Sequence, residues 1–105
     1  MKNVYMILLL LPFSTFAADA DYKLVIKEHR FQPSELNIPA GKKVKLFIEN
    51  QDATPEEFES HPLNREKVIA GNSTATIYIG PLQAGRYPFF GEFNEATAQG
   101  VIVVK

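Results

Sequence analysis

The sequence predicts an all-β domain, folded as a sandwich or a small barrel. Six or seven short segments either alternate between apolar and polar residues or are rich in β-branched and aromatic residues, as strands are. Residues typical of turns separate these segments at intervals of about eight to twelve residues, which is the spacing of all-β domains. No segment after the first twenty residues shows a sustained helical period.

The first half of this region contains three predicted strands. Residues 22–28 alternate as a half-buried strand does, and residues 31–33, which include a proline, end the pattern. Residues 35–38 form a short second strand. Residues 39–42, Pro-Ala-Gly-Lys, are typical of a turn, and residues 43–50 then alternate cleanly as a third strand.

The second half contains an acidic segment followed by several more predicted strands. Residues 67–69 are a short apolar piece, and residues 74–79 are β-branched and aromatic. Residues 86–93 form an aromatic strand, and residues 101–104 form a last strand that is wholly apolar.

Alternation along these strands predicts which side chains lie inside the domain. We expect Phe93 to face the core with the alternating aromatic residues of its strand, and Phe90 to lie on the opposite face. The other residues expected inside are Leu46, Ile48, Phe58, Ile77, Ile79, Tyr87, Phe89, Ile102 and Val104.

The first twenty residues have the pattern of a secretory signal peptide. Lys2 supplies a short positive region, residues 4–13 are apolar, and small residues follow up to Ala20. The apolar run is shorter than the roughly 20 residues that cross a bilayer as a helix. The sequence therefore predicts a signal peptide at residues 1–20 and one periplasmic domain at residues 21–105. An N-terminal membrane anchor is the alternative.

The composition argues against several classes of site. The chain of 105 residues contains no cysteine, so it offers neither a thiolate metal ligand nor a cysteine nucleophile. Its formal net charge is −1 and no basic stripe runs along it, which argues against nucleic-acid binding. A small exported domain without disulfides depends on an efficient core.

Residues 54–66, TPEEFESHPLNRE, concentrate negative charge beside a histidine. Two prolines make a long helix unfavourable here, and a short strand over residues 56–60 fits better. One face of that strand would carry Glu56, Phe58 and Ser60, and the other would carry Glu57 and Glu59. Carboxylate ligands suit hard cations. A solvated acidic loop is the alternative interpretation of this segment.

Four stretches follow one another in the order FQPSELNIPAGKKVKLFIEN, NQDATPEEFE, LQAGRYPFFGEF and AQGVIVV. With these stretches, residues 21–105 resemble the cupredoxin-like domains, and most of all the small periplasmic ones allied to EfeO and to bacterial iron permeases. The resemblance implies a Greek-key β-sandwich of cupredoxin type, with a metal site at one end in the loops between strands.

The residues that bind type 1 copper in cupredoxins are missing from this chain. Such sites use two histidines, a cysteine thiolate and a weak axial ligand. Here the upstream histidine position holds Glu56, the cysteine position holds Gly91, and the axial methionine position holds Ala98. The downstream histidine is absent from residues 92–95. We therefore expect neither type 1 copper nor electron transfer of that kind.

The resemblance instead implies that two acidic segments lie side by side at one end of the sandwich. A carboxylate-rich site with one imidazole suits iron or Cu(II) better than Cu(I). The metal ligands that we predict are Glu56, Glu57, His61, Glu66 and Glu92. Glu59 and Glu95 lie in the same segments and stay undecided.

The function that this interpretation favours is a periplasmic accessory protein that binds iron or copper and serves ferrous-iron uptake through a membrane permease. It favours binding over oxidation of iron, because no usual copper site is visible to accept electrons. One alternative is a metal-free interaction module whose acidic end docks a partner protein. Another is a copper chaperone that uses His61 and carboxylates.

Cleavage of the predicted signal peptide can be checked by mass spectrometry. Because the small residues end near Ala20, protein recovered from the periplasm should begin between Ala18 and Asp21. Exported protein that still begins at Met1 would refute the cleavage.

Overall fold

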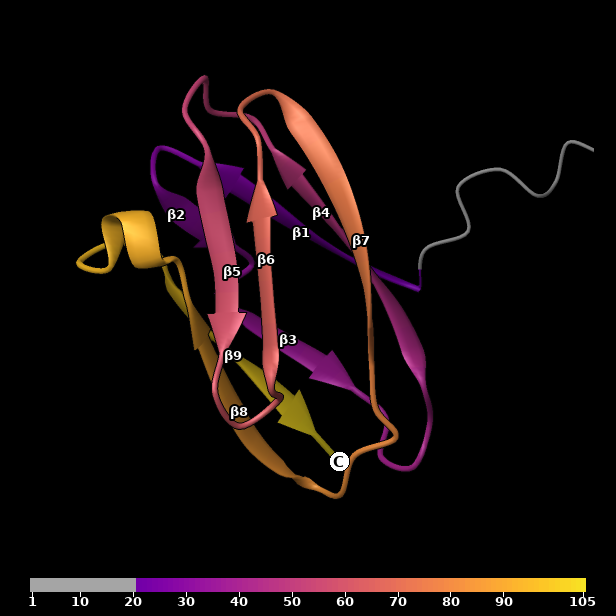
Figure 1. Ribbon diagram of the computed structural model, residues 1–105. Helices are drawn as coiled ribbons and strands as arrows, with labels where there is room; N and C mark the ends of the chain where they lie inside the picture. Colours follow the sequence, from indigo (N-terminus) through magenta and orange to yellow (C-terminus); the bar gives the residue numbers. More distant parts are fainter. Residues whose placement is uncertain (1–20) are drawn as a thin grey trace, which may run out of the picture.

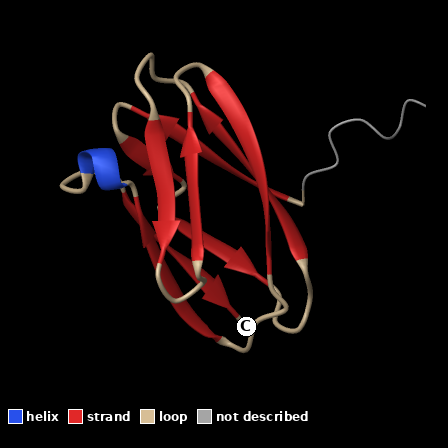
Figure 2. Cartoon of the chain, viewed as in Figure 1, coloured by secondary structure: helices blue, strands red, loops and turns tan. Residues whose placement is uncertain are grey.

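The computed structural model describes residues 21–105, which fold as two packed β-sheets (Figure 1; Figure 2). Residues 1–20, where we predict the signal peptide, lie outside the described residues. In order, the elements are β1 (Tyr22–Lys27), β2 (Arg30–Gln32), β3 (Glu35–Ile38), β4 (Val44–Asn50), β5 (Glu56–Ser60), β6 (Arg65–Ile69), β7 (Ser73–Ile79), β8 (Gly85–Phe90), the short 3-10 turn η2 (Glu92–Asn94) and β9 (Gln99–Val104). Nothing within residues 21–105 forms a helix long and apolar enough to cross a membrane.

The strands divide between a four-stranded sheet, β2-β1-β4-β7, and a five-stranded sheet, β3-β9-β8-β5-β6. Two pairs are parallel, β1 with β4 and β3 with β9, and the other pairs are antiparallel. Strand β6 lies at an edge of its sheet, next to β7 of the other sheet (Figure 1). The Arg65 side chain links this edge to the other sheet: its Nε donates a hydrogen bond to the carbonyl oxygen of Tyr78 on β7, at 3.0 Å.

An aromatic cluster occupies the centre of the core between the two sheets. The rings of Phe58 on β5 and Phe89 on β8 stack with their centroids 4.8 Å apart. The ring of Phe31 meets that of Phe89 edge-on at 4.9 Å. Both the stacked and the edge-to-face arrangement are favourable for aromatic rings. The position of β5 in the fold is therefore fixed from the inside by Phe58.

Most of the predicted core is confirmed. Tyr87 is half-buried and packs against the core. The residues that are buried as expected are Leu46, Ile48, Phe58, Ile77, Ile79, Phe89, Ile102 and Val104.

The expectation that residues 31–33 only interrupt the first strand is wrong. Phe31 lies on β2, which pairs antiparallel with β1, and its side chain is buried in the core. Glu28 and His29 both adopt positive φ angles and turn the chain between the two strands. The carboxylate of Asp52 accepts hydrogen bonds from the backbone N–H groups of both residues. These hydrogen bonds to Asp52 stabilise the positive φ angles at a turn that usually contains glycine or asparagine.

The expectation that Phe93 faces the core is also wrong. Strand β8 ends at Phe90, and the chain then enters η2, so the alternation does not continue as far as Phe93. The Phe93 side chain is 51% exposed. Phe90, which we expected on the face of β8 opposite the core, is half-buried.

The burial of Phe89 predicts a large loss of stability on truncation. Phe89→Ala should lower the free energy of unfolding by about 3–5 kcal/mol, because it leaves a cavity against Phe58 and Phe31. Phe93→Ala, a matched change at an exposed ring, should alter it by no more than about 0.5 kcal/mol. Denaturant unfolding measures both. A loss below about 1 kcal/mol for Phe89→Ala would mean that the face of β8 has been assigned wrongly.

Candidate metal centre

Four carboxylates meet on the five-stranded sheet. Glu57 and Glu59 come from β5, Glu66 comes from β6, and Glu92 comes from η2. One oxygen atom of each group lies within 4.8 Å of the others. We call these four residues the carboxylate cluster.

The pairing of the strands explains why these residues meet. Glu59 lies directly opposite Glu66 in the antiparallel pair of β5 and β6. On its other side Glu59 pairs with Phe90 of β8. The chain leaves β8 just after Phe90, and this brings η2, which carries Glu92, next to β5 (Figure 1). Side chains alternate along β5, so Glu57 and Glu59 lie on the face opposite the buried Phe58.

Glu57 is the buried member of the carboxylate cluster. The residue is 2% exposed, and its Oε1 atom has no hydrogen-bond partner among residues 21–105. Burial away from water is the main reason why the pKa of Glu57 rises to about 8, and the carboxylates of Glu66 and Glu92 add to the effect. The charge of Glu59 raises this pKa further. Without a cation, the cluster therefore holds a proton at neutral pH.

Glu56 does not join the carboxylate cluster, although we predicted it as a ligand. It lies on the core face of β5 and is 1% exposed. Its Oε1 accepts hydrogen bonds from the backbone N–H of Glu57 at 2.9 Å and of Phe93 at 3.1 Å. Its Oε2 accepts a hydrogen bond from Nδ2 of Asn94 at 2.6 Å. The carboxylate is thus fully occupied by donors of the protein itself.

His61 lies beside the carboxylate cluster but not within it. Its Nδ1 is 3.9 Å from Oε2 of Glu59, and its ring lies 5.6 Å from that of Phe90. The side chain is 77% exposed. A pocket of about 210 Å³ runs from His61 past Asn64 and Arg65 to two members of the cluster, Glu59 and Glu66.

The structure thus brings together three of the five predicted ligands, Glu57, Glu66 and Glu92. It adds Glu59, which alternation had placed on the same face as Glu57, and leaves Glu95 outside. Three members of the cluster are strand residues, so the cluster lies on the face of β5 and β6 and not only in loops between strands. Four oxygen donors without nitrogen or sulfur suit a hard cation.

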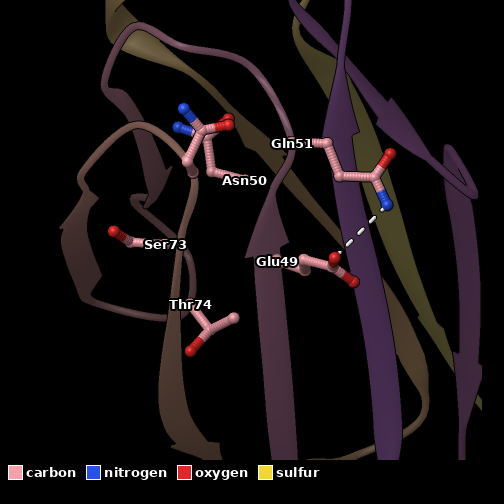
Figure 3. A pocket seen from close by; sticks show the side chains of 6 residues that line it. Glu49, Asn50, Gln51, Ser73 and Thr74 are labelled. Atoms are coloured by element: carbon pink, nitrogen blue, oxygen red, sulfur yellow. Dashed lines mark hydrogen bonds between the residues drawn. The ribbon is translucent and has the colours of Figure 1, made fainter.

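A second pocket, of about 290 Å³, lies where β4 ends and β7 begins (Figure 3). Asn50 is buried there, and its Nδ2 donates hydrogen bonds to the carbonyl oxygens of Thr54, Ile69 and Ala70. Gln51 bonds to Glu49, the one carboxylate in this lining. Asn50 therefore holds the neighbouring loops together, and the lining of this pocket offers a single carboxylate.

The sequence matches a model of the cupredoxin-like domain over residues 3–104. It is also 44% identical, over 84 residues, to an uncharacterized protein of Rickettsia prowazekii (strain Madrid E). That alignment covers 80% of this chain and 67% of the Rickettsia protein.

Solved structures with a similar fold include several copper proteins. The metal-binding domain of the Cu(I)-exporting ATPase CopA of Streptococcus pneumoniae D39 has a TM-score of 0.70 at 13% identity, covering 79% of this chain and 82% of that one. Auracyanin A, a blue copper protein of Chloroflexus aurantiacus, has a TM-score of 0.68 at 18% identity, covering 79% and 96%. Amicyanin of Paracoccus versutus scores 0.63 at 18% identity, covering 84% and 83%. At such low identities these similarities describe the fold, a two-sheet sandwich of cupredoxin type.

The raised pKa of Glu57 predicts how the stability of the metal-free protein depends on pH. Below about pH 4.5, the ordinary value, the folded and unfolded chains both keep this proton. Between 4.5 and about 8 the unfolded chain loses the proton and the folded chain keeps it, so this group makes stability fall as the pH rises.

Glu57→Gln removes this titration. The variant should be more stable than the wild type at neutral pH, and its advantage should grow as the pH rises through that window. Thermal melts in the presence of a chelator, from pH 4.5 to pH 8, measure the difference, and Glu95→Gln serves as a control outside the cluster. Parallel pH profiles for wild type and Glu57→Gln would contradict the raised pKa.

Proposed function

The chain belongs to the cupredoxin-like domain family, and from that premise we propose that it is a periplasmic metal-binding accessory protein of ferrous-iron uptake. The observation that carries the proposal is the carboxylate cluster, with one oxygen of each of four glutamates within 4.8 Å of the others. The buried Oε1 of Glu57, which has no partner within residues 21–105, supports it further. A surface that needed only solubility would mix its charges and leave them in water.

A cation in the cluster would resolve two electrostatic costs at once. It would neutralise the repulsion between carboxylates such as Glu59 and Glu66, which lie directly opposite each other on neighbouring strands. It would also provide the partner that Oε1 of Glu57 otherwise lacks. Glu57, Glu59, Glu66 and Glu92 are therefore the proposed ligands, and His61 lies beside them, with its Nδ1 3.9 Å from Oε2 of Glu59.

The donor set favours iron or Cu(II) over Cu(I). Carboxylate oxygens are hard ligands, whereas Cu(I) prefers thiolates and thioethers. The chain contains no cysteine, and the cluster contains no methionine. Copper is tested beside iron because two of the similar solved proteins are described as copper proteins.

The role in iron uptake is supported by resemblance. Residues 21–105 resemble the small periplasmic cupredoxin-like proteins allied to EfeO and to bacterial iron permeases, and residues 1–20 have the pattern of a signal peptide. In the proposed role the protein captures the ion and delivers it to a membrane permease. Binding is favoured over oxidation, since the residues of a type 1 copper centre are missing from the sequence.

A second candidate function is a metal-free interaction module. Val68, which lies opposite Glu57 in the strand register, is 54% exposed, and Phe93, next to Glu92 in the chain, is 51% exposed. Apolar side chains beside an acidic group form a surface on which a basic partner protein could dock. This function requires no metal, so metal titration separates it from the first.

Thermal melts with Fe(II), Fe(III), Cu(II) and Zn(II) test metal binding. A metal that binds only the folded protein should stabilise it by about 2.7 kcal/mol at a hundredfold excess over Kd. Glu92→Gln should weaken this effect and leave the metal-free protein equally or more stable, because one repelling charge is gone. Glu95→Gln, three residues away and outside the cluster, should respond to metal as the wild type does.

Calorimetric titration of the same variants gives the affinities directly. If no metal shifts the melt of the wild type, metal binding is refuted and the interaction module becomes the preferred function. If Glu92→Gln loses stability without metal, Glu92 is a structural partner and not a ligand.

A further inference from the structure

We propose that Glu56 is a positioning residue, which holds η2 from the core side and so keeps Glu92 in the carboxylate cluster. The inference rests on the proposed metal-binding function and extends it to a residue outside the cluster. The Glu56 carboxylate bonds to the backbone N–H of Glu57, to Phe93 and to Asn94, and to no carboxylate of the cluster. It is carried by the hydrogen bonds of Glu56 and by the place of its two targets in the chain.

Glu56 and Glu57 contact the same turn from opposite faces of β5. The carboxylate of Glu56 accepts hydrogen bonds from the backbone N–H of Phe93 at 3.1 Å and from the side chain of Asn94 at 2.6 Å. The carboxylate of Glu57, on the other face, meets that of Glu92 in the cluster. Consecutive residues of a strand point in opposite directions, so Glu56 and Glu57 can contact η2 from the two faces of β5.

The bond to Phe93 bears directly on Glu92. The N–H of Phe93 and the carbonyl group of Glu92 belong to the same planar peptide unit. When Glu56 holds that N–H, it fixes the plane of the peptide and with it the backbone of Glu92. The second bond, from Asn94, fixes the residue at the other end of η2.

The backbone of Gly91 also packs closely against the carboxylate of Glu56. Gly91 passes so close that a Cβ atom added there would lie 2.7 Å from both Cδ and Oε1 of Glu56. The N–H of Gly91 donates to the carbonyl oxygen of Ala98 at 2.9 Å, which closes the loop around η2. The carboxylate is therefore confined between β5 and the residues that lead into η2.

A buried carboxylate is a costly way to support a turn. Removing its charge from water is unfavourable unless several donors replace the lost hydration, and here three donors do so. The desolvation cost of Glu56 is explained if metal binding requires Glu92 at a fixed position. Without a cation, the charges of Glu59 and Glu66 disfavour a third carboxylate at the position of Glu92, and η2, which carries it, is only three residues long.

Glu56→Gln tests the inference, because it keeps the shape and turns one acceptor into a donor. We expect metal affinity to fall by about 10–100-fold, the usual effect of changing a residue that orients a metal ligand. We also expect faster amide hydrogen exchange at Phe93. Ser60→Ala is the matched control. Ser60 is a buried polar residue on the same face of β5, with bonds to Pro88 and Leu63 and none to η2, so metal affinity should not change.

A double-mutant cycle separates positioning from general damage. In a Glu92→Gln background, Glu56→Gln should weaken binding no further, because the residue that it positions is already lost as a ligand. Equal weakening in both backgrounds would overturn the inference. If Glu56→Gln does not fold, Asn94→Ala replaces it in the cycle, since it removes one of the same bonds from a half-buried site.

The outcome for the wild type distinguishes the two proposals. If the wild type binds metal and neither Glu56→Gln nor Asn94→Ala weakens binding, positioning alone is overturned. If the wild type binds no metal, the proposed function fails, and positioning of Glu92 for a metal is overturned with it. Exchange at Phe93 then still shows whether Glu56 holds the turn for another purpose.

Discussion

The alternation of side chains along β5 is the constraint on which the rest of the structure depends. Five residues must serve two unlike surroundings, an aromatic core on one side and a group of negative charges on the other. Phe58 anchors the strand in the core, where its burial is worth about 1.5–3 kcal/mol. That anchor holds Glu57 and Glu59 at fixed positions on the other face, although the charge of Glu59 disfavours ionisation of Glu57. The stability of the sandwich therefore maintains an arrangement of charges that would otherwise separate.

Much of the fold could be predicted from local pattern. The bounds of β3 and β5 match the predicted strands at residues 35–38 and 56–60, and the faces of β5 are as alternation requires. Strand β2 was missed because its turn relies on Asp52, which lies more than twenty residues away in the sequence. Phe93 was misplaced because the aromatic alternation was continued past Gly91, which lies between the end of β8 and the start of η2.

The candidate site shows both the strength and the limit of such reasoning. Glu56 and Glu57 were both predicted as ligands, although the same alternation places them on opposite faces of β5, and local geometry could have separated them. The approach of Glu92 is different, because it depends on the pairing of Glu59 with Phe90 across two strands distant in sequence. The resemblance to cupredoxin-like domains supplied that long-range information, and periodicity could not.

Glu66 differs from the other members of the carboxylate cluster because it stands on an edge strand. β6 has a strand partner on one side only, with the Arg65 side chain bonding across to β7. Edge elements open locally at a lower free energy than central ones, so β6 can fray while Phe58 and Phe89 stay packed. In the role that we propose, local opening of β6 would give a bound ion a route out of the cluster. The rate of metal release would then depend on local opening of β6 and would not require unfolding of the sandwich.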